Sequence, residues 1–242
     1  MQSRLEPLKI EREREDYPRI DYIDRNGVQW IEINRGCKRQ CPFCYADPNY
    51  KEFEVPEIKS NKVMIIGEGF LYDKSIMEKI YILGETKLNK KVVYYGLNQG
   101  IDFRLLNKDI ANLLCAYRFG IINSKGRWYK GLKFAWDLGL NHEKLAKETI
   151  DLLEEVGYKR RNIQVFVLVN WKISYEDCLY KLKKLREWGV KIDDCTWNTT
   201  KKEKLTLHWN KEQLIDFRKK ARKHNQLINF DGYDPEITHK NN

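Results

Sequence analysis

Short apolar and β-branched runs alternate along this chain with segments of helical periodicity. The runs are rich in Val, Ile, Phe and Tyr, which favour strands. In the segments between them, apolar residues recur every three or four positions, as on the buried face of a helix. The pattern predicts strands at residues 28–33, 62–66, 91–96, 131–136, 163–169 and 190–195, and helices at residues 74–83, 107–117, 142–156 and 175–188.

Strands that alternate with helices predict an α/β fold in which helices cover a parallel sheet. A chain of 242 residues is long enough for one such domain, and neither an internal repeat nor a break in composition divides it. After the last strand, a helix with a basic outer face is expected to begin near Lys211. Its packing face is expected to consist of Leu214, Ile215 and Phe217.

The composition, with 42% hydrophobic and 33% charged residues, is that of a soluble globular protein. No apolar run approaches the ~20 residues that span a membrane, so we expect no membrane partner. The N-terminus shows no secretory signal, which favours a reducing, cytoplasmic location. The net charge of +10 and the pI near 9.2 allow an anionic substrate or partner, such as nucleic acid, a phosphorylated metabolite or an acidic protein surface.

One basic segment resembles a nucleic-acid-binding loop, because its cations are interleaved with aromatic residues. These residues are Arg118, Lys125, Arg127, Trp128, Tyr129, Lys130 and Lys133. The segment precedes the fourth predicted strand, and in an α/β barrel the loops before strands lie on the face opposite the active site. We therefore expect a solvated connecting loop.

Three cysteines in one short run, Cys37, Cys41 and Cys44, carry most of the chemical information. Cysteine thiolates are the usual protein ligands of iron–sulfur clusters. The CxxxCxxC spacing provides ligands for three irons of a [4Fe–4S] cluster and leaves the fourth iron open to a small molecule. A metal site with an open position is typically a site of chemistry.

Two other interpretations of these cysteines are a structural zinc site and unligated or disulfide-bonded thiols. Structural zinc usually has four protein ligands, and no further cysteine or histidine lies nearby in the sequence. The remaining cysteines, Cys115, Cys178 and Cys195, are isolated. Cys115 and Cys178 lie in apolar periodic stretches, where buried small hydrophobic residues are expected.

The cysteine spacing, with Phe43 before the third cysteine, resembles the signature of the radical S-adenosylmethionine (radical SAM) superfamily. The resemblance covers residues 26–200 and implies a partial (βα)6 TIM-like barrel. Residues 1–25 would then be an N-terminal extension, and residues 201–242 a C-terminal helical extension packed on the barrel. The resemblance further implies that Cys37, Cys41 and Cys44 hold a [4Fe–4S] cluster with SAM at the open iron, and that a flavodoxin- or ferredoxin-type protein donates the electron.

The same resemblance implies residues that contact SAM, because active sites in α/β barrels lie at the carboxyl ends of the strands. Gly67 and Glu68 resemble the family's GGE segment, which binds the methionine amino group. The other implied positions are Tyr45 near the adenine, Asp137 at the ribose and Val169 on the strand beside the adenine. The alternatives are a turn or capping acid for Glu68, a helix N-cap for Asp137 and cluster shielding for Tyr45.

Polar residues are concentrated after the third predicted strand, where a plain connection would not need them. Gln99 offers an amide to a polar substrate, and Asp102 and Arg104 are close enough in sequence to pair. The NQGxDxR pattern, like the later FAWD segment, resembles poorly characterised radical SAM proteins of phages, bacteria and archaea. We therefore expect Gln99, Asp102 and Arg104 to bind substrate. The alternative for Asp102 is a cap on the helix near Asn107.

Together these features predict a radical SAM enzyme that cleaves SAM reductively to a 5′-deoxyadenosyl radical, which abstracts hydrogen from a substrate that the sequence does not identify. Two other functions agree with the same residues. One is an activating enzyme that makes a glycyl radical on a protein partner. The other is a non-catalytic, metal-stabilised module that binds nucleic acid.

Overall fold

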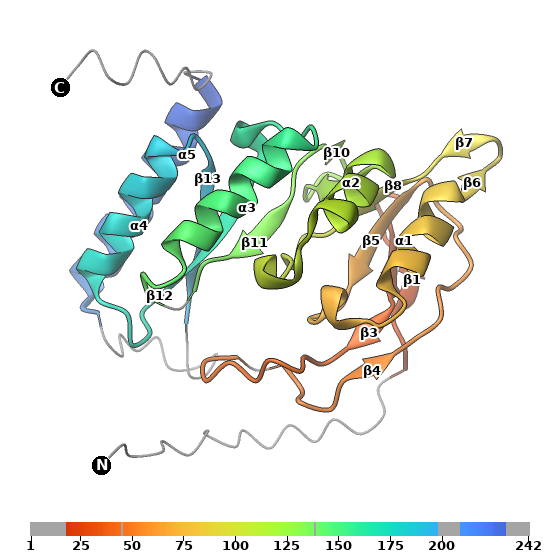
Figure 1. Ribbon diagram of the computed structural model, residues 1–242, viewed down its shortest axis with the longest axis horizontal. Helices are drawn as coiled ribbons and strands as arrows, with labels where there is room; N and C mark the ends of the chain where they lie inside the picture. The colour runs from red at the N-terminus through yellow and green to blue at the C-terminus, as the bar shows by residue number, and fades with distance from the viewer. Residues whose placement is uncertain (1–17, 45, 138, 198–208, 231–242) are drawn as a thin grey trace.

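The computed structural model describes residues 18–44, 46–137, 139–197 and 209–230 of the chain, and it has an α/β fold (Figure 1). Each of the six predicted strand segments contains a strand. These are β2 (Gln29–Glu32), β5 (Lys62–Ile66), β8 (Tyr94–Gly96), β11 (Lys133–Ala135), β12 (Gln164–Val169) and β13 (Lys191–Thr196). The helices are also present, as α1 (Ile76–Glu85), α2 (Lys108–Ala116), α3 (Glu143–Glu155), α4 (Tyr175–Glu187) and α5 (Lys211–Phe230).

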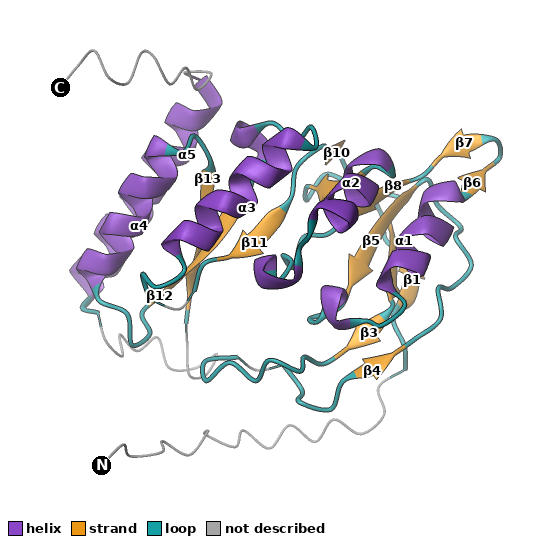
Figure 2. Ribbon diagram, viewed as in Figure 1, coloured by secondary structure: helices purple, strands orange, loops and turns teal. Residues whose placement is uncertain are grey.

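The strands form two main sheets (Figure 2). The larger has the order β1-β2-β5-β8-β9-β10, and β2, β5, β8 and β9 run parallel in it. The smaller is the parallel sheet β11-β12-β13. A single bridge from Ile101 to Phe134 joins the two, and the Ile101 N–H donates to the Lys133 carbonyl over 2.8 Å. The edge strands of the larger sheet are β1 (Asp21–Ile23) and β10 (Trp128–Tyr129), and β9 is Phe119–Ile122.

Within the described residues, no hydrogen bonds between β13 and β2 close these strands into a barrel. The predicted α/β class is thus confirmed, whereas the predicted barrel stays a prediction. Four short strands form two small hairpins outside the main sheets: β3 (Asn34–Arg35) with β4 (Lys51–Glu52), and β6 (Lys87–Leu88) with β7 (Lys91–Val92). Short 3-10 helices occur at Phe70–Tyr72, Phe103–Leu105 and Arg160–Asn162.

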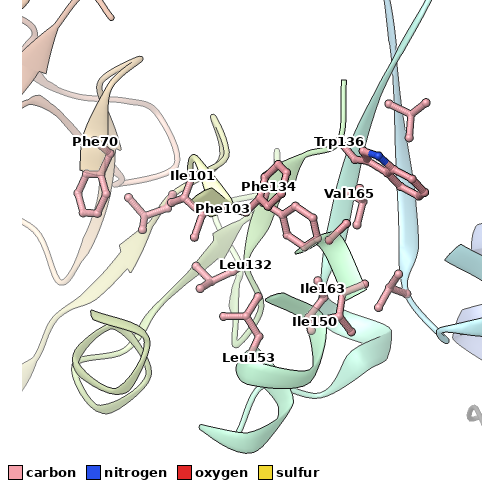
Figure 3. Packing of buried hydrophobic residues seen from close by; sticks show 14 of the residues in the cluster. Phe70, Ile101, Phe103, Leu132, Phe134, Trp136, Ile150, Leu153, Ile163 and Val165 are labelled. Atoms are coloured by element: carbon pink, nitrogen blue, oxygen red, sulfur yellow. The ribbon is translucent and has the colours of Figure 1, made fainter. Parts of the chain in front are cut away.

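One face of each main sheet is buried under helices, and these faces form the core. In the larger sheet, Ile31 and Val63 pack in one cluster with the α1 side chains Ile80 and Leu83. In the smaller sheet, Phe134, Val165 and Val167 belong to the same cluster as the α3 side chains Ile150 and Leu153. Figure 3 shows Phe134 and Val165 near these α3 side chains. Burying one such side chain contributes about 1.5–3 kcal/mol, so this layer supplies most of the stabilising free energy.

Gly157, directly after the predicted helix at residues 142–156, explains why α3 ends at Glu155. Gly157 has a φ of +103°, which an L side chain adopts only with strain. Its N–H donates to the Glu154 carbonyl, and the Tyr158 N–H reaches back to the Leu153 carbonyl. This pattern of bonds at a left-handed glycine satisfies the last carbonyls of the helix.

The prediction of a solvated loop at residues 118–133 was wrong. The segment contains the β9–β10 hairpin, and all four residues of β9 are buried. Phe119, Ile121 and Ile122 are strand-forming residues and gave a local apolar signal. The cations around them led to the prediction of a loop instead.

The last helix, α5, packs on β13 and α4. Phe217 is fully buried there, as expected, and Leu214 is half-buried. Ile215, however, is 45% exposed, so its prediction as a packing residue was wrong. The buried stripe instead continues through Ala221, His224 and Ile228, positions that follow the helical repeat from Phe217. In the part of the chain that the structure describes, no helix is long and apolar enough to cross a bilayer.

Candidate functional site

The loop that carries the three predicted ligand cysteines follows β3 and reverses the direction of the chain. Gly36 has a φ of +79°, and a Cβ there would lie 2.5 Å from the Asp47 carbonyl oxygen, so only glycine fits. The Cys37 N–H donates to the same carbonyl over 2.8 Å. The two ends of the loop, residues 36–47, are thus held together at its base. We refer to these residues as the cysteine loop.

The thiols of Cys37 and Cys41 are half-buried and that of Cys44 is exposed, and none of them is in a disulfide. Burial raises the pKa of Cys41 to about 11; the nearby Arg39 guanidinium opposes this shift, whereas Cys44 and Cys37 add to it. Burial likewise raises the pKa of Cys37, and Cys44 again contributes. The three sulfurs therefore lie within electrostatic reach of one another.

Three soft sulfur donors on one loop match the donor chemistry of an iron–sulfur cluster. The three cysteines do not form a complete ligand set in this structure. In the described part of the chain, no group of three His, Cys, Asp or Glu side chains has metal-binding geometry. The donors fit the predicted cluster by type and by sharing one loop. Of the other cysteines, Cys178 is fully buried, as predicted, whereas Cys115 is only half-buried.

Gly67 and Glu68 follow β5 and contact the base of the cysteine loop. The Glu68 carboxylate accepts a hydrogen bond from the Gly36 N–H at 2.9 Å. The Gly67 N–H donates to the Gln99 side-chain oxygen at 2.6 Å. Glu68 is exposed, and the 3-10 helix that begins at Phe70 has Gly69 at its N-cap position. Glu68 therefore ties the cysteine loop to β5, and Gln99, predicted to bind substrate, supports the turn at Gly67.

Asn34 lies beside this turn with its polar atoms unpaired. The residue is fully buried, and neither its Oδ1 nor its Nδ2 has a hydrogen-bond partner among the described residues. A Cβ at Gly67 would lie 2.1 Å from Asn34 Oδ1, so the glycine leaves room for the amide. A buried unpaired amide is costly, which makes this position suited to a polar ligand group or a water molecule. Sequence reasoning missed Asn34, although it begins β3, the short strand directly before the cysteine loop.

Asp102 and Arg104, predicted to bind substrate, form the pair that their spacing suggested. The Asp102 carboxylate accepts from Arg104 Nε at 2.8 Å and from the Tyr72 hydroxyl at 3.0 Å. It also lies 3.9 Å from the Arg39 guanidinium of the cysteine loop. Burial opposes ionisation of Asp102, but the hydrogen bonds and charge of Arg104 outweigh it and hold the pKa of Asp102 below its ordinary value.

The alternative role of Asp102 as a cap on α2 is not observed. The Asn107 side chain caps α2 by accepting from the Ile110 N–H at 2.9 Å. Asp102 instead caps the short 3-10 helix Phe103–Leu105 through the Arg104 N–H. Its local capping role coexists with the contact to the cysteine loop.

Asp137 follows β11 and is half-buried near the cysteine loop. Burial raises the pKa of Asp137 to about 6, and the positive charges of Lys181 and Arg39 oppose the shift. It does not cap α3, whose N-cap position is His142. Lys181, a residue that sequence reasoning missed, extends from α4 and donates to the carbonyls of Trp136 at 2.8 Å and Asp137 at 3.3 Å. Burial lowers the pKa of Lys181 to about 8.

The ends of β12 and β13 reach the cysteine loop through aromatic residues. Trp197 donates from Nε1 to the Phe43 carbonyl over 3.0 Å, and the Phe43 and Trp171 rings lie 6.2 Å apart. Val169, predicted to lie beside the adenine, is fully buried at the end of β12. Tyr45, the other predicted adenine neighbour, lies outside the described residues.

A polar row on the smaller sheet was not predicted. Lys133 of β11 pairs with Asp193 of β13 over 2.8 Å, and its ammonium lies 5.1 Å from the centre of the Phe166 ring of β12. Side chains on one face of a strand alternate, so Cys195 and Asp137 continue the same row toward the cysteine loop. The alternating polar positions in these strands were the available signal.

The structure thus brings Gly67, Glu68 and Gln99 together at the base of the cysteine loop, places Asp102 and Arg104 beside Arg39, and keeps Val169 apart in the core. No protein-family model matches the chain, and no curated protein matches its sequence.

Proposed function

We propose that the chain is a radical SAM enzyme whose cysteine loop holds a [4Fe–4S] cluster at one end of a partial (βα)6 barrel. The observation that carries the proposal is that the ends of five parallel strands reach this one loop. Glu68 contacts Gly36, Asp102 and Asp137 lie near Arg39, and Trp171 and Trp197 contact Phe43. The carboxyl ends of parallel strands are where α/β folds build active sites.

The bridge between Ile101 and Phe134 supports the barrel part of this proposal. It links the segment after β8 to β11, so that β2, β5 and β8 of one sheet and β11, β12 and β13 of the other would follow one another as consecutive βα units, although β9 also pairs with β8. Residues 26–200 would form the barrel, and residues 1–25 and 201–242 the two extensions. α5 packs on β13, as the C-terminal extension requires.

The bound cluster would supply the electron that cleaves SAM to methionine and a 5′-deoxyadenosyl radical, and this radical would take a hydrogen atom from the substrate to become 5′-deoxyadenosine. The residues of the chain would bind and orient the reactants and exclude water. Cys37, Cys41 and Cys44 would act as ligands. Glu68 would accept from the methionine amino group, and the unpaired Asn34 amide would offer a donor and an acceptor to the same part of SAM.

Asp137 is suited to the ribose, because a carboxylate accepts from vicinal hydroxyls. Arg104 is partly exposed beside Asp102, so it would face a polar substrate. Gln99 supports the Gly67 turn and would act on SAM through that turn. A flavodoxin- or ferredoxin-type protein would donate the electron.

The first test is metal content after anaerobic reconstitution with iron and sulfide. We expect about four irons and four sulfides per chain, the composition of the cluster. A Cys37→Ala, Cys41→Ala, Cys44→Ala variant should lose them, whereas the matched control Cys178→Ala, which alters a buried thiol outside the loop, should keep them. Stoichiometric zinc without iron uptake would contradict the proposal.

The second test is reductive cleavage of SAM. Reconstituted protein, SAM and dithionite should yield 5′-deoxyadenosine, quantified by mass spectrometry, and the triple cysteine variant should yield none. A protein that carries the cluster but forms no 5′-deoxyadenosine under any reducing condition would be a cluster-stabilised binding protein, and the enzymatic proposal would then be wrong.

A further inference from the structure

The face of the larger sheet that turns away from α1 and α2 carries two pairs of aromatic rings. Trp30 and Trp128 both pack against a small apolar cluster of Val28, Met64 and Ile122. This cluster is separate from the main core, because alternate residues of β2 and β5 point to opposite faces.

Each tryptophan of this face has a tyrosine partner. Tyr22 of β1 stacks on Trp30 with parallel rings whose centres lie 6.2 Å apart, and Tyr94 lies 4.8 Å from Trp128. Tyr22 is 53% exposed, and Trp30, Trp128 and Tyr94 are half-buried. These aromatic side chains are fixed on strands and are partly accessible, as in surfaces that stack against flat ligands.

Two turns far apart in sequence meet next to these rings. Asn26, in the turn between β1 and β2, donates to the Ser124 carbonyl in the turn between β9 and β10 over 3.4 Å. Gly126 of the second turn lies against Asn26 and Val28, and its carbonyl accepts from the Lys62 ammonium over 3.0 Å. The two turns meet because β9 and β10 form a hairpin, where the sequence had predicted a loop.

The joined turns present three cations, Arg25, Lys125 and Arg127. All three are exposed, and none forms an ion pair with any described residue. The acid of these turns, Asp24, accepts hydrogen bonds from Trp30 Nε1 at 3.0 Å and from the Val28 N–H at 3.0 Å. Its carboxylate is therefore used within the turn, and the three cations are left for an external anion.

We propose that this surface, formed by Tyr22, Trp30, Tyr94, Trp128, Arg25, Lys125 and Arg127, binds single-stranded nucleic acid. We call it the aromatic–basic face. Cations that contact phosphates and aromatic rings that stack on bases are the two elements of sequence-tolerant single-strand binding. The net charge of +10 adds a long-range attraction for the same ligand. A duplex satisfies only the cations, because its bases are already stacked and paired.

The proposal does not depend on the cysteine loop, since the aromatic–basic face uses none of its residues. Nucleic-acid binding should persist in protein that contains no iron, and it should persist in the triple cysteine variant if that variant folds. Failure of the radical SAM proposal would leave it intact, and failure of binding would leave the enzymatic proposal intact.

The test is fluorescence anisotropy of the full chain with labelled 20-nucleotide oligo(dT), oligo(U) and a DNA duplex, each at several salt concentrations. Both single strands should bind more tightly than the duplex at equal salt, and the comparison of oligo(dT) with oligo(U) distinguishes DNA from RNA. The variant Arg25→Gln, Lys125→Gln, Arg127→Gln should weaken single-strand binding at least tenfold. It should also reduce the slope of log affinity against log salt by roughly 2, as expected for three lost phosphate contacts.

The matched control is Lys219→Gln, Arg222→Gln, Lys223→Gln, which removes three exposed cations from α5 and changes the net charge equally. It should alter affinity less than twofold. Tyr22→Leu keeps an apolar strand residue but removes the outer ring, and it should weaken single-strand binding about fivefold or more without affecting duplex binding. Circular dichroism confirms that each variant is folded.

Three results would overturn the proposal. The first is no single-strand binding by the wild-type protein at 50 mM salt. The second is an equal loss in the α5 control, which would mean that net charge alone attracts the probe. The third is equal affinity for single strand and duplex together with an unchanged Tyr22→Leu variant, which would exclude stacking.

Discussion

The guanidinium of Arg39 lies 3.9 Å from the carboxylate of Asp102, and this ion pair links the cysteine loop to the loop after β8. Only 17% of the Arg39 side chain and 11% of the Asp102 side chain are exposed, so water screens the pair weakly. Asp102 also accepts hydrogen bonds from Tyr72 and Arg104. One carboxylate thus connects three segments around the candidate site.

We expect a double-mutant cycle on Arg39→Gln and Asp102→Asn to give a coupling free energy of about 0.5–1 kcal/mol in urea unfolding. The control cycle uses Lys144 and Glu148, which lie at nearly the same distance, 3.8 Å, with 91% and 56% of their side chains exposed. Its coupling should be near zero, because exposed pairs are solvated and screened. Equal coupling in the two cycles would show that burial does not strengthen the Arg39–Asp102 pair.

The unpaired amide of Asn34 leads to a prediction about its neighbour Gly67. Gly67→Ala should destabilise the fold by about 1–3 kcal/mol, because the added Cβ would lie 2.1 Å from Asn34 Oδ1. Asn34→Ala should be nearly neutral in urea unfolding, since removing a costly unpaired amide offsets the packing that the truncated side chain loses.

The double variant Asn34→Ala, Gly67→Ala should recover most of the stability lost in Gly67→Ala, because the truncated side chain leaves room for the new methyl group. A double variant no more stable than Gly67→Ala would mean that the strain arises elsewhere in the turn.

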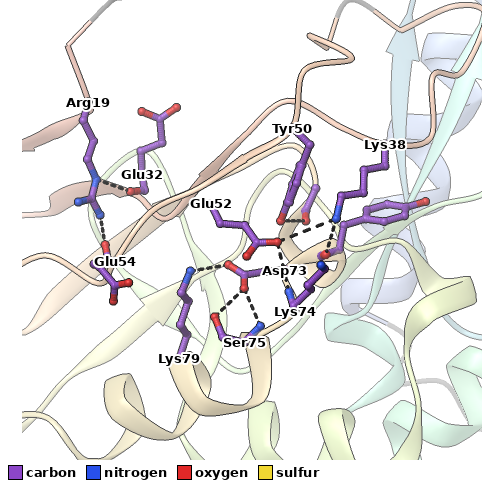
Figure 4. A network of polar contacts seen from close by, with 12 residues as sticks. Arg19, Glu32, Lys38, Tyr50, Glu52, Glu54, Asp73, Lys74, Ser75 and Lys79 are labelled. Carbon is purple, nitrogen blue, oxygen red and sulfur yellow. Dashed lines mark hydrogen bonds and ion pairs between the residues drawn. The ribbon is translucent and has the colours of Figure 1, made fainter.

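The buried ion pair between Lys79 and Asp73 should be far more important than its surface counterparts (Figure 4). Its atoms lie 2.5 Å apart, with 7% and 0% of the two side chains exposed, and the Ser75 N–H and hydroxyl also donate to Asp73. Lys79→Met should lower the free energy of unfolding by about 3–5 kcal/mol, because it leaves a buried carboxylate without its counter-charge.

The comparison for Lys79 is Lys108→Met, which breaks a pair of similar length, 2.6 Å, whose side chains are 62% and 57% exposed. That loss should stay below about 1 kcal/mol. Similar losses in the two variants would argue that water reaches the Asp73 carboxylate.

His224 predicts how stability changes with pH. Burial lowers the pKa of His224 to about 4 in the folded protein, where its Nε2 lies 2.8 Å from the Val190 carbonyl. In the unfolded chain its pKa is about 6.5. Between these values the unfolded chain binds a proton that the folded protein does not, so stability falls as the pH drops from about 6.5 toward 4, by at most about 3 kcal/mol.

His224→Gln keeps a donor for the Val190 carbonyl and should flatten this dependence, measured as urea midpoints from pH 4.5 to 8. Above pH 7 the wild-type and variant curves should run parallel, because histidine is then neutral in both states. An unchanged slope below pH 6.5 would assign the pH dependence to other groups.

Much of the fold followed from local pattern. The strand at Lys62–Ile66 was predicted to the residue, because the four consecutive apolar positions that follow Lys62 leave few alternatives for a buried parallel strand. The strand expected at residues 91–96 begins only at Tyr94, since Lys91 and Val92 pair in a separate hairpin with Lys87 and Leu88. Whether two-residue strands pair in a hairpin depends on the chain around them, so the sequence of such short strands predicts little.

The candidate site was predictable only in part. Glu68, Asp102 and Asp137, chosen because they follow strands, do lie near the cysteine loop, whereas their contacts with SAM or substrate stay predictions. The partner residues Arg39 and Lys181 were missed, because each pairs with a residue far away in the sequence. Arg39 of the cysteine loop contacts Asp102, and Lys181 reaches the site from a helix that follows the next strand. Such contacts depend on how the elements pack against one another, and the periodicity of a single segment does not predict that packing.

A single substitution of Asp137 should change the stability of the fold and the affinity for SAM in different directions. Burial raises its pKa to about 6, so at pH 8 the folded protein holds a half-buried, ionised carboxylate whose pKa in the unfolded chain is about 3.9. The neutral isostere Asp137→Asn should therefore be as stable as the wild type or more stable at pH 8, by up to roughly 3 kcal/mol. If Asp137 accepts from the ribose of SAM, the same substitution should weaken SAM binding by about 1.5–3 kcal/mol, the range for a hydrogen bond to a charged group. Calorimetry on reconstituted protein measures the binding, and iron content should be unchanged.

The matched control is Asp193→Asn. Asp193 is an acid of the same row that lies farther from the cysteine loop and pairs with Lys133, so its neutralisation should leave SAM affinity unaltered. A stabilised Asp137→Asn variant that binds SAM as tightly as the wild type would exclude the ribose role and leave Asp137 as a substrate-facing or purely electrostatic neighbour of Arg39.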